Sequence, residues 1–302
     1  MSLVLAMLID RWLGEPPPAL HPVVWMGCYL GWIGKRLPGL RPAAAFTLGM
    51  AAWLAGAALV AGAYGCARML AAECPRWLTV LATALLLKPL FALRMLLTEV
   101  AAVERASGES LESGRCRLRR IVSRDTTRLD AGEVRESALE SLAENLSDSL
   151  VAPLFWFALF GLAGAAVYRF ANTADAMWGY RGRWEWAGKF AARADDLLNL
   201  IPARITALTL LLAGRQRCRL MRRLPREAAR TASPNSGWPM AALALSLGVR
   251  LRKPGMYALN ANGAAPAAAD VSRALRRAAL LAWLFAAALA AITWRFPGVI
   301  HD

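Results

Sequence analysis

The 302-residue chain is poor in histidine, lysine and cysteine, and these shortages exclude several kinds of site. Its two histidines and five cysteines never occur at the spacing that binds zinc. The odd number of cysteines, with no C-x-x-C pair, indicates reduced thiols rather than a disulfide framework. The sequence also lacks a G-x-x-x-x-G-K-[ST] loop and a G-x-G-x-x-G motif, so any nucleotide site must be of an uncommon kind.

Positive charge is abundant and comes almost wholly from arginine. The formal net charge is +15, yet only four of the 36 basic residues are lysines. The arginines lie between apolar blocks, as the positive-inside rule of membrane proteins predicts, and this distribution argues against a nucleic-acid partner. The arginine-dense loop from Arg215 to Arg230 predicts a cytoplasmic face or a contact with anionic lipid.

Apolar residues make up 57% of the chain and gather in blocks, which is typical of a protein embedded in a lipid bilayer. Five blocks approach the roughly 20 residues that cross a hydrocarbon core. They are Ala43–Ala63, Trp77–Leu97, Leu150–Phe170, Leu197–Ala213 and Ala278–Trp294. Several contain proline or a charged residue, which indicates a broken helix or a polar cavity. We therefore expect an all-α fold: a polytopic integral membrane protein with broken or re-entrant helices and a cytoplasmic helical insertion.

The chain is predicted to form a single membrane-embedded domain over residues 1–302. Its polar insertions lie at 98–148, 171–196 and 214–273. The first predicts two or more helices separated near Gly108 and Gly114, and Ser233–Pro239 in the third has the signature of a turn followed by a helix start. We expect the three insertions to converge on one cytoplasmic pocket.

That convergence requires the apolar segment 150–170 to turn back instead of crossing the membrane. Gly161-Leu162-Ala163-Gly164 is the expected turn, because each arm is then only about ten residues long, below the spanning length. The segment 197–213 must likewise be a short, partly embedded helix.

The segment from Ser123 to Asp148 is predicted to form a helix with its acidic residues on one face. At 100° per residue, five carboxylates fall within an arc of about 120°, and an apolar stripe lies opposite. These acidic residues are Glu133, Glu136, Glu140, Glu144 and Asp148. No lysine lies among them, and two interpretations stay open: a solvated face, or carboxylates that pair with an arginine or a metal from elsewhere in the fold.

Two further polar segments also allow two interpretations each. The aromatic and arginine residues of 172–186 form either an interfacial belt or a cationic platform for a large anion. Asp195 and Asp196 either cap the N-terminus of the next helix or hold Mg²⁺. Arg204 follows Pro202 in an apolar block and should face protein or water, whereas His21 is expected to be structural.

Five blocks of sequence together resemble the CobD/CbiB family of cobalamin biosynthesis, in the order of that family and over nearly the whole chain. The blocks are LGEPPPALHPVVWMG at Leu13–Gly27, Ser123–Thr126 with ESLAENLSDSLVAP at Glu140–Pro153, NTADAMWGYR at Asn172–Arg181, RADDLLNLIPAR at Arg193–Arg204 and SPNSGWP at Ser233–Pro239. The chain departs from the family pattern at Cys28 and at Thr231-Ala232, which argues against catalytic roles there.

The resemblance implies an adenosylcobinamide-phosphate synthase, a ligase of the bacterial cytoplasmic membrane that crosses the membrane several times. Such an enzyme joins adenosylcobyric acid to (R)-1-aminopropan-2-yl phosphate, with ATP and Mg²⁺ as cofactors. The implied partners are the corrinoid substrate, aminopropanol phosphate, the lipid bilayer and other membrane-associated corrinoid enzymes. The alternatives are a membrane transporter, a sensor, or a scaffold for enzymes of the corrinoid pathway.

Roles for individual residues follow as hypotheses from the chemistry of this reaction. Glu140 or Glu144 would take the proton from the attacking amine. Asp148, Asp175, Asp195 and Asp196 are the candidates for the metal. The candidates for substrate binding are Arg124, Asp125, Asn145, Tyr180, Arg181, Asn199, Arg204, Ser233 and Asn235. Glu133 and Glu136, one to two turns earlier on the stripe, are expected to tolerate substitution.

Overall fold

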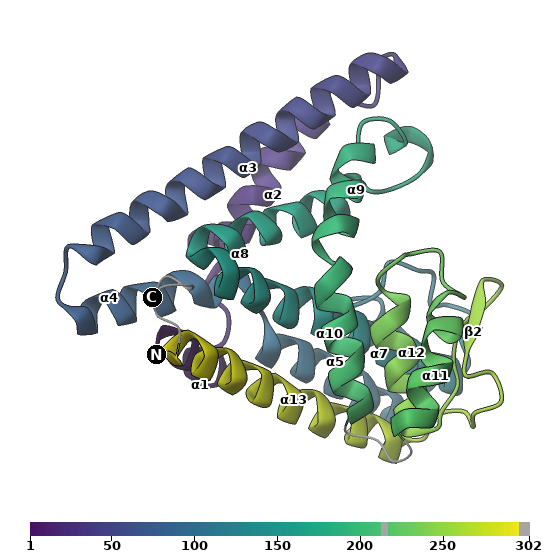
Figure 1. The fold of residues 1–302 in the computed structure, drawn as a ribbon. Coiled ribbons are helices and arrows are strands. Elements are labelled where there is room, and N and C mark those ends of the chain that lie inside the picture. The colour runs from purple at the N-terminus through teal and green to yellow at the C-terminus, as the bar shows by residue number, and fades with distance from the viewer. Residues whose placement is uncertain (213–216, 296–302) are drawn as a thin grey trace. The chain divides into compact units, whose positions relative to one another are not determined.

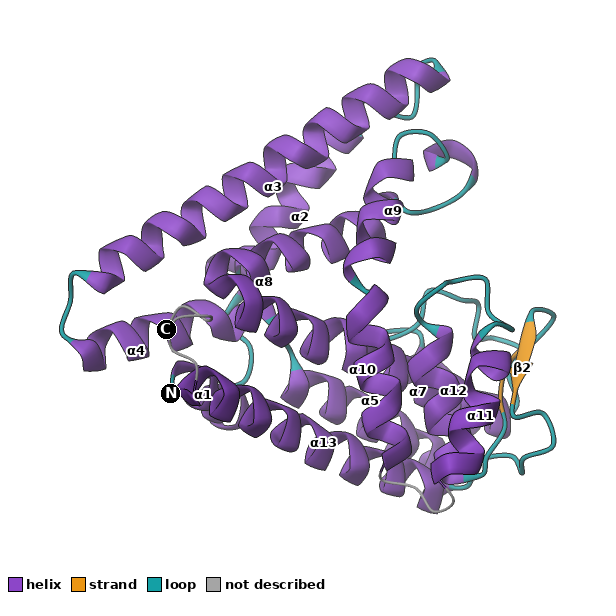
Figure 2. Cartoon of the chain, viewed as in Figure 1, coloured by secondary structure: helices purple, strands orange, loops and turns teal. Residues whose placement is uncertain are grey.

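The computed structural model describes residues 1–212 and 217–295, and Figures 1 and 2 show a chain built almost entirely of helices. The α-helices are α1 (Ser2–Leu13), α2 (Pro22–Gly34), α3 (Pro42–Ala72), α4 (Arg76–Leu87), α5 (Leu93–Glu109), α6 (Leu111–Leu118), α7 (Ala131–Leu146), α8 (Ala152–Trp178), α9 (Lys189–Leu198), α10 (Leu200–Leu212), α11 (Arg217–Ala228), α12 (Gly237–Leu247) and α13 (Ala268–Arg295). Short helical turns are η1 (Pro18–Leu20), η2 (Lys88–Leu90), the π-helical η3 (Ser147–Val151) and η4 (Gly182–Trp184). In the described part of the chain, β1 (Leu251–Lys253) and β2 (Tyr257–Leu259) form one antiparallel pair.

Four stretches are long and apolar enough to cross a membrane by length and composition. They are Pro42–Ala72, Arg76–Glu109, Ala131–Trp178 and Ala268–Thr293. The expected all-α membrane fold is thereby confirmed, and four of the five predicted blocks fall within these stretches. The fifth block holds α10, whose 13 residues span about 20 Å and are too short to cross the hydrocarbon core. Ala213, at the end of that block, lies outside the described residues.

Helix α8 is broken at the predicted turn. Gly161 has φ 63° and ψ −154°, a conformation that glycine adopts far more readily than other residues. A Cβ at Gly164 would collide with the carbonyl oxygen of Trp156. Residues eight apart lie about 12 Å apart along a straight helix, so this contact requires the chain to fold back on itself. The turn is confirmed, whereas its place relative to a membrane stays a prediction.

The first polar insertion contains the expected helices, but two of the predicted boundaries are wrong. Ser110 caps α6, and Gly114 lies inside that helix instead of ending it. Residues 123–130 form a loop, and α7 begins only at Ala131. The backbone N–H of Glu133 donates to Asp130 Oδ1 at 2.7 Å, and the backbone N–H of Asp130 donates to Glu133 Oε2 at 2.9 Å. This capping box fixes the helix start.

The residues divide by their contacts into two compact units. The first unit contains Met1–Ala92, Ala152–Asn199 and the chain from Ala286, and the second contains Leu93–Val151 and Leu200–Phe285. The single domain expected over residues 1–302 stays a prediction. The convergence of the three polar insertions on one pocket also stays a prediction.

The first unit contains a buried charge cluster that joins its N-terminal segment to η2. Lys88 Nζ lies 3.1 Å from Asp10 Oδ1 and 2.9 Å from Glu15 Oε2. His21 Nε2 is 3.2 Å from Glu15 Oε2, while His21 Nδ1 accepts the backbone N–H of Val23 at the start of α2. Burial alone would raise the pKa of Glu15, but the hydrogen bonds from His21 and Lys88 lower it. The structural role expected for His21 is confirmed.

Helix α7 lies at the centre of the second unit, where it packs against α5, α12 and β1. The apolar stripe predicted for it is buried, with Val134 and Leu139 fully enclosed. The third insertion also contains more helix than expected, because α11 occupies most of the segment predicted as an arginine-rich loop; residues 213–216 lie outside the described chain. Helix α12 begins at Gly237, as the Ser233–Pro239 signature predicted.

Candidate functional site

A polar cavity of about 290 Å³ lies within the second unit. Its walls come from α7, the loop before α7, the turn before α12 and the β1–β2 hairpin. The structure brings together five residues that the sequence proposed for the site: Arg124, Glu140, Glu144, Asn145 and Ser233. These residues come from three separate parts of the chain, so the cavity is a product of the fold.

A short ion pair forms one wall of the cavity. Arg124 Nη2 donates to Glu140 Oε2 at 2.6 Å, and Arg124 Nη1 donates to the hydroxyl of Ser137 at 3.1 Å. Glu140 is 1% exposed, and its Oε1 accepts no hydrogen bond from the described residues. The interpretation of the acidic stripe as a solvated face is therefore wrong, because an arginine from another segment pairs with this buried carboxylate.

Two other residues of the acidic stripe, Glu133 and Glu136, were expected to tolerate substitution, and their contacts show that this expectation is wrong. Glu136 is fully buried, and its Oε1 accepts hydrogen bonds from Arg250 Nε and Nη2 at 3.1 and 2.9 Å. Its Oε2 accepts the backbone N–H of Arg252 at 2.9 Å. Glu133 closes the capping box and lies 3.1 Å from Arg252 Nη2. Both residues hold β1 against α7, which is a structural task.

Lys253, Met256 and Tyr257 of the hairpin line the cavity, although the sequence analysis proposed none of them. Burial, followed by the negative charge of Glu140, raises the pKa of Tyr257. Two signals in the sequence point to this segment: Lys253 is one of only four lysines, and Pro254-Gly255 directly after it predicts a tight turn.

Arg204 and Asn235 bind each other and do not line the cavity. Arg204 Nη1 donates to Asn235 Oδ1 at 2.6 Å, and Arg204 Nη2 donates to the carbonyl of Pro234 at 3.1 Å. The guanidinium also lies over the ring of Trp238, 4.6 Å from its centroid. Arg204 thus faces protein, as expected, and it fixes the turn that presents Ser233 to the cavity.

Asp125 also differs from its predicted place, because it is exposed and does not line the cavity. Its Oδ1 accepts the backbone N–H and the hydroxyl of Thr127 at 2.9 and 2.8 Å. The backbone hydrogen bond, followed by that from the hydroxyl, lowers the pKa of Asp125. Asp125 therefore stabilises the loop that carries Arg124.

A second group of predicted residues lies within the first unit, around Asp195. Asn199 Nδ2 donates to Asp195 Oδ2 at 3.0 Å, and Tyr168 donates to Asn199 Oδ1 at 2.8 Å. Asn172 Nδ2 lies 3.5 Å from Asp195 Oδ1. Burial, followed by the negative charge of Asp175, raises the pKa of Asp195 to about 7. This aspartate is thus a buried carboxyl held by amide groups.

The interpretation of Asp195 and Asp196 as N-terminal caps is wrong. Both residues lie in the last turns of α9, which begins at Lys189. Asp196 Oδ2 is 3.7 Å from Arg193 Nη1 in a more exposed position. Tyr180 and Arg181 lie exposed in the loop after α8.

Among residues 1–212 and 217–295, no group of three His, Cys, Asp or Glu side chains is placed to hold a metal ion. Mg²⁺ usually takes one or two carboxylates and completes its shell with water and substrate phosphates. Asp175 and Asp195 lie close enough for the charge of Asp175 to raise the pKa of Asp195, and their role in binding Mg²⁺ stays a prediction. Asp148, the fourth residue proposed for the metal, lies in η3 of the second unit.

Comparison with known proteins identifies a family for the chain. The family model described as CobD/Cbib protein matches residues 3–283. A probable cobalamin biosynthesis protein CobD from Thermococcus kodakarensis is 43% identical over 274 residues, which is 90% of this chain and 88% of the relative. The cobalamin biosynthesis protein CobD of Rhodobacter capsulatus is 38% identical over 320 aligned positions, with 97% of both chains covered. No solved structure matches the chain. The matches span nearly the whole sequence, and the chain belongs to the CobD/CbiB family of cobalamin biosynthesis proteins.

Proposed function

We propose that the chain is an adenosylcobinamide-phosphate synthase of the bacterial cytoplasmic membrane. It would join the propionate carboxylate of adenosylcobyric acid to the amine of (R)-1-aminopropan-2-yl phosphate, with hydrolysis of ATP. Membership of the CobD/CbiB family supports a role in cobalamin biosynthesis. The ligase reaction itself is our inference from the sequence blocks and from the chemistry of the cavity.

The observation that carries this proposal is the mixture of charges in the cavity of the second unit. Arg124 and Lys253 provide positive charge, which suits a carboxylate or phosphate of a substrate. Glu140 and Glu144 provide carboxylates within the same walls. A cavity that holds both kinds of group can bind an anion and accept a proton, and amide formation from a phosphorylated amine requires both.

A carboxylate and an ammonium ion do not condense spontaneously in water, so the acid has to be activated first. Most simply, a carboxylate oxygen of the corrinoid attacks the terminal phosphorus of ATP, forming an acyl phosphate and releasing ADP. The amine then attacks the acyl carbon, the C–N bond forms, and inorganic phosphate leaves. Glu140 or Glu144 takes the proton that the nitrogen loses.

The chain would contribute little covalent chemistry to phosphoryl transfer and would act mainly by position and charge. Arg124 is held in place by Glu140 and Ser137 and lines the cavity, so an anionic substrate would meet a guanidinium group that is already positioned. Mg²⁺, when bound, would neutralise phosphate charge, and Asp175 with Asp195 are the residues we propose to hold it.

A direct assay tests the proposal. Purified protein is incubated with adenosylcobyric acid, aminopropanol phosphate, ATP and Mg²⁺, and the amide product is detected by mass spectrometry. We expect product only when all four are present, with one ADP released for each amide formed. Reactions without ATP and with unphosphorylated aminopropanol are the controls.

The same preparation distinguishes the alternatives. A transporter would move corrinoid across the wall of a proteoliposome without forming an amide, and a scaffold would do neither. Absence of amide from a folded, complete reaction would contradict the ligase proposal.

A further inference from the structure

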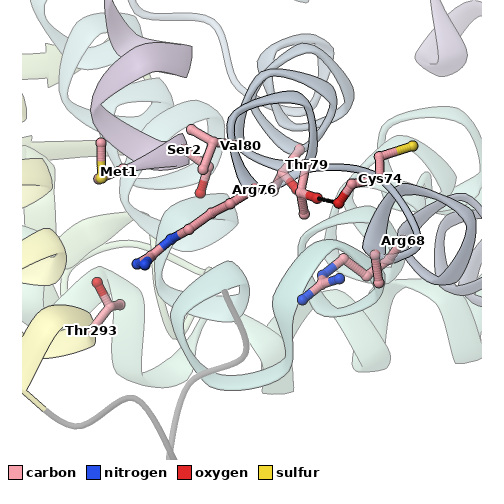
Figure 3. A pocket seen from close by; sticks show the side chains of 10 residues that line it. Met1, Ser2, Arg68, Cys74, Arg76, Thr79, Val80 and Thr293 are labelled. Carbon is pink, nitrogen blue, oxygen red and sulfur yellow. Dashed lines mark hydrogen bonds between the residues drawn. The ribbon is translucent and has the colours of Figure 1, made fainter.

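A second cavity, of about 410 Å³, lies within the first unit. Figure 3 shows the side chains of Arg68 and Arg76 reaching into it from α3 and α4. The hydroxyl-bearing residues Ser2, Thr79 and Thr293 also line its walls. None of these residues belongs to the sites described above.

The two arginines carry positive charge without an acidic partner among the described residues. The ion pairs found in the first unit include those of His21, Lys88 and Arg193, and neither Arg68 nor Arg76 forms one with a described residue. A guanidinium group offers five N–H donors in a fork that matches phosphate oxygens. Two such groups lining one cavity indicate a site for an anion.

The cavity continues into apolar space. Arg68 and Thr83 also line a neighbouring cavity of about 260 Å³, whose other walls include Phe157 and Phe160. Tyr64 in turn belongs both to that cavity and to an apolar groove of about 330 Å³. All three spaces lie within the first unit, so a single elongated ligand can extend from the arginines along α3.

Tyr64 provides an independent sign that a ligand belongs here. The residue is only 7% exposed, and its hydroxyl has no hydrogen-bond partner among the described residues. A buried hydroxyl without a partner costs about 1–3 kcal/mol. An ester carbonyl or a glycerol hydroxyl between the phosphate and the acyl chain would supply the missing partner.

We propose that this continuous space binds one anionic phospholipid. Its phosphate would lie between Arg68 and Arg76, and an acyl chain would occupy the apolar cavities beyond Arg68 and Tyr64. The location of the arginines agrees with binding of a lipid head group. Residues 73–75 join two candidate membrane spans and therefore lie near a membrane surface. A soluble phosphate would satisfy the arginines but would leave the apolar part without an occupant.

Native mass spectrometry of the whole protein in detergent tests the head-group part of the proposal. The probes are dioleoyl phosphatidylglycerol and dioleoyl phosphatidylcholine. We expect the wild-type protein to retain the anionic lipid at least about tenfold more tightly, because both lipids carry a phosphate but the choline ammonium of phosphatidylcholine is repelled by the two arginines. R68A/R76A should lose this preference. R41A, at the opposite end of α3, is the matched control and should keep it.

A glycine pair on α3 tests the acyl-chain part. Gly65 lines the cavity next to Arg68, and a Cβ there meets no atom within 4 Å. Gly62, on the same helix, is equally open but lines none of the three spaces. Both G65L and G62L improve helix propensity and should fold. G65L should lower retention of phosphatidylglycerol at least about fivefold, whereas G62L should not.

Three outcomes would overturn the proposal. The first is retention of phosphatidylglycerol by R68A/R76A that equals retention by R41A, and the second is equal retention by G65L and G62L. The third is displacement of the lipid from wild-type protein by millimolar inorganic phosphate with no effect of G65L, which would make the site one for free phosphate. Because these residues lie outside the proposed ligase site, loss of lipid and loss of the ligase reaction are separate results.

Discussion

The two units of this chain treat their buried acidic residues in opposite ways. In the second unit, the carboxylates of Glu136 and Glu140 each accept hydrogen bonds from an arginine. In the first unit, Asp195 is equally enclosed but is held by the amides of Asn172 and Asn199, with Asp175 as a nearby negative charge. The three carboxyl groups are all buried, but those of the second unit are stabilised by arginines and that of the first unit by neutral amides.

This difference separates two kinds of chemistry. A carboxylate paired with an arginine can orient an anionic substrate next to a base. A carboxyl surrounded by neutral amides and another carboxyl binds a proton more readily, or binds a cation that replaces the proton. We therefore propose that Glu140 of the second unit orients an anionic substrate, and that Asp175 and Asp195 of the first unit bind a cation.

The largest effect is expected at the paired carboxylate in the cavity. Glu140→Gln keeps the shape of the side chain but removes the negative charge that orients Arg124 and can accept a proton. We expect amide formation to fall by about 100-fold or more. Glu109→Gln, an exposed position at the end of α5, is the control and should retain its activity. Normal turnover of Glu140→Gln would show that the Arg124–Glu140 pair is only structural.

Glu136→Ala breaks the ion pair between Glu136 and Arg250, which we regard as purely structural, and so provides a contrast with Glu140. Removing one partner of a buried ion pair costs about 3 kcal/mol, at the low end of the usual range because Arg250 is partly exposed. The free energy of unfolding, measured by chemical denaturation in detergent, should fall by that amount. The pair of Glu112 and Arg115 gives the reference because the Glu112 carboxylate is exposed, and Glu112→Ala should change stability by less than about 0.5 kcal/mol.

Lys253→Met tests the residue of the cavity that the sequence analysis missed. Loss of a charged contact to a substrate phosphate should raise the KM for aminopropanol phosphate by about tenfold, with a smaller change in kcat and no change in melting temperature. Lys35→Met removes an exposed lysine from the first unit and should leave the KM unchanged. A KM that is equal in both variants would remove Lys253 from the proposed substrate site.

The smallest effect is expected from the pH dependence of Asp195. Its folded-state pKa of about 7 lies above its usual value of 3.8, so the folded state holds a proton that the unfolded state has released between these two values. Its contribution to stability is therefore present at low pH and is lost as the pH rises towards 7. Thermal unfolding of Asp195→Asn should show less of this decline, by a few degrees.

Two controls accompany that measurement. Glu185→Gln, at an exposed position of the same unit, should follow the wild-type pH profile. Addition of Mg²⁺ above pH 7 should stabilise the wild-type protein and not Asp195→Asn. Equal stabilisation of both would contradict the assignment of Asp195 to the metal.

Local patterns in the sequence predicted the secondary-structure elements better than they predicted which side chains contact one another. The period of α7 correctly placed its carboxylates on a face that meets arginines. It could not identify those arginines, because Arg124 is 16 residues from Glu140 and Arg250 is 114 residues from Glu136. The start of α7 is a different kind of error, since the sequence contains the Asp130-x-x-Glu133 capping signal, whereas the acidic pattern alone extends the helix back to Ser123.

The candidate site shows the same limit. Arg124, Glu140, Glu144, Asn145 and Ser233 share a cavity, as motif membership had suggested. Asp125 and Arg204 belong to the same motifs, yet their side chains bind other residues of the protein. Spacing along the chain does not reveal whether a polar side chain will bind a ligand or hold the loop that presents its neighbour, because that choice depends on contacts made by distant segments.

The charge cluster of Asp10, Glu15 and Lys88 sets an order of events during synthesis. Helix α1 emerges from the ribosome before η2 and has only 12 residues, so it is too short to cross a membrane alone. Its buried Asp10 and the following Glu15 need Lys88, and 73 residues separate Glu15 from that lysine. At about 5–20 residues per second, the ribosome needs roughly 4 to 15 s to supply it. During that interval the N-terminal segment must wait in a polar environment, and only the arrival of η2 allows it to be buried.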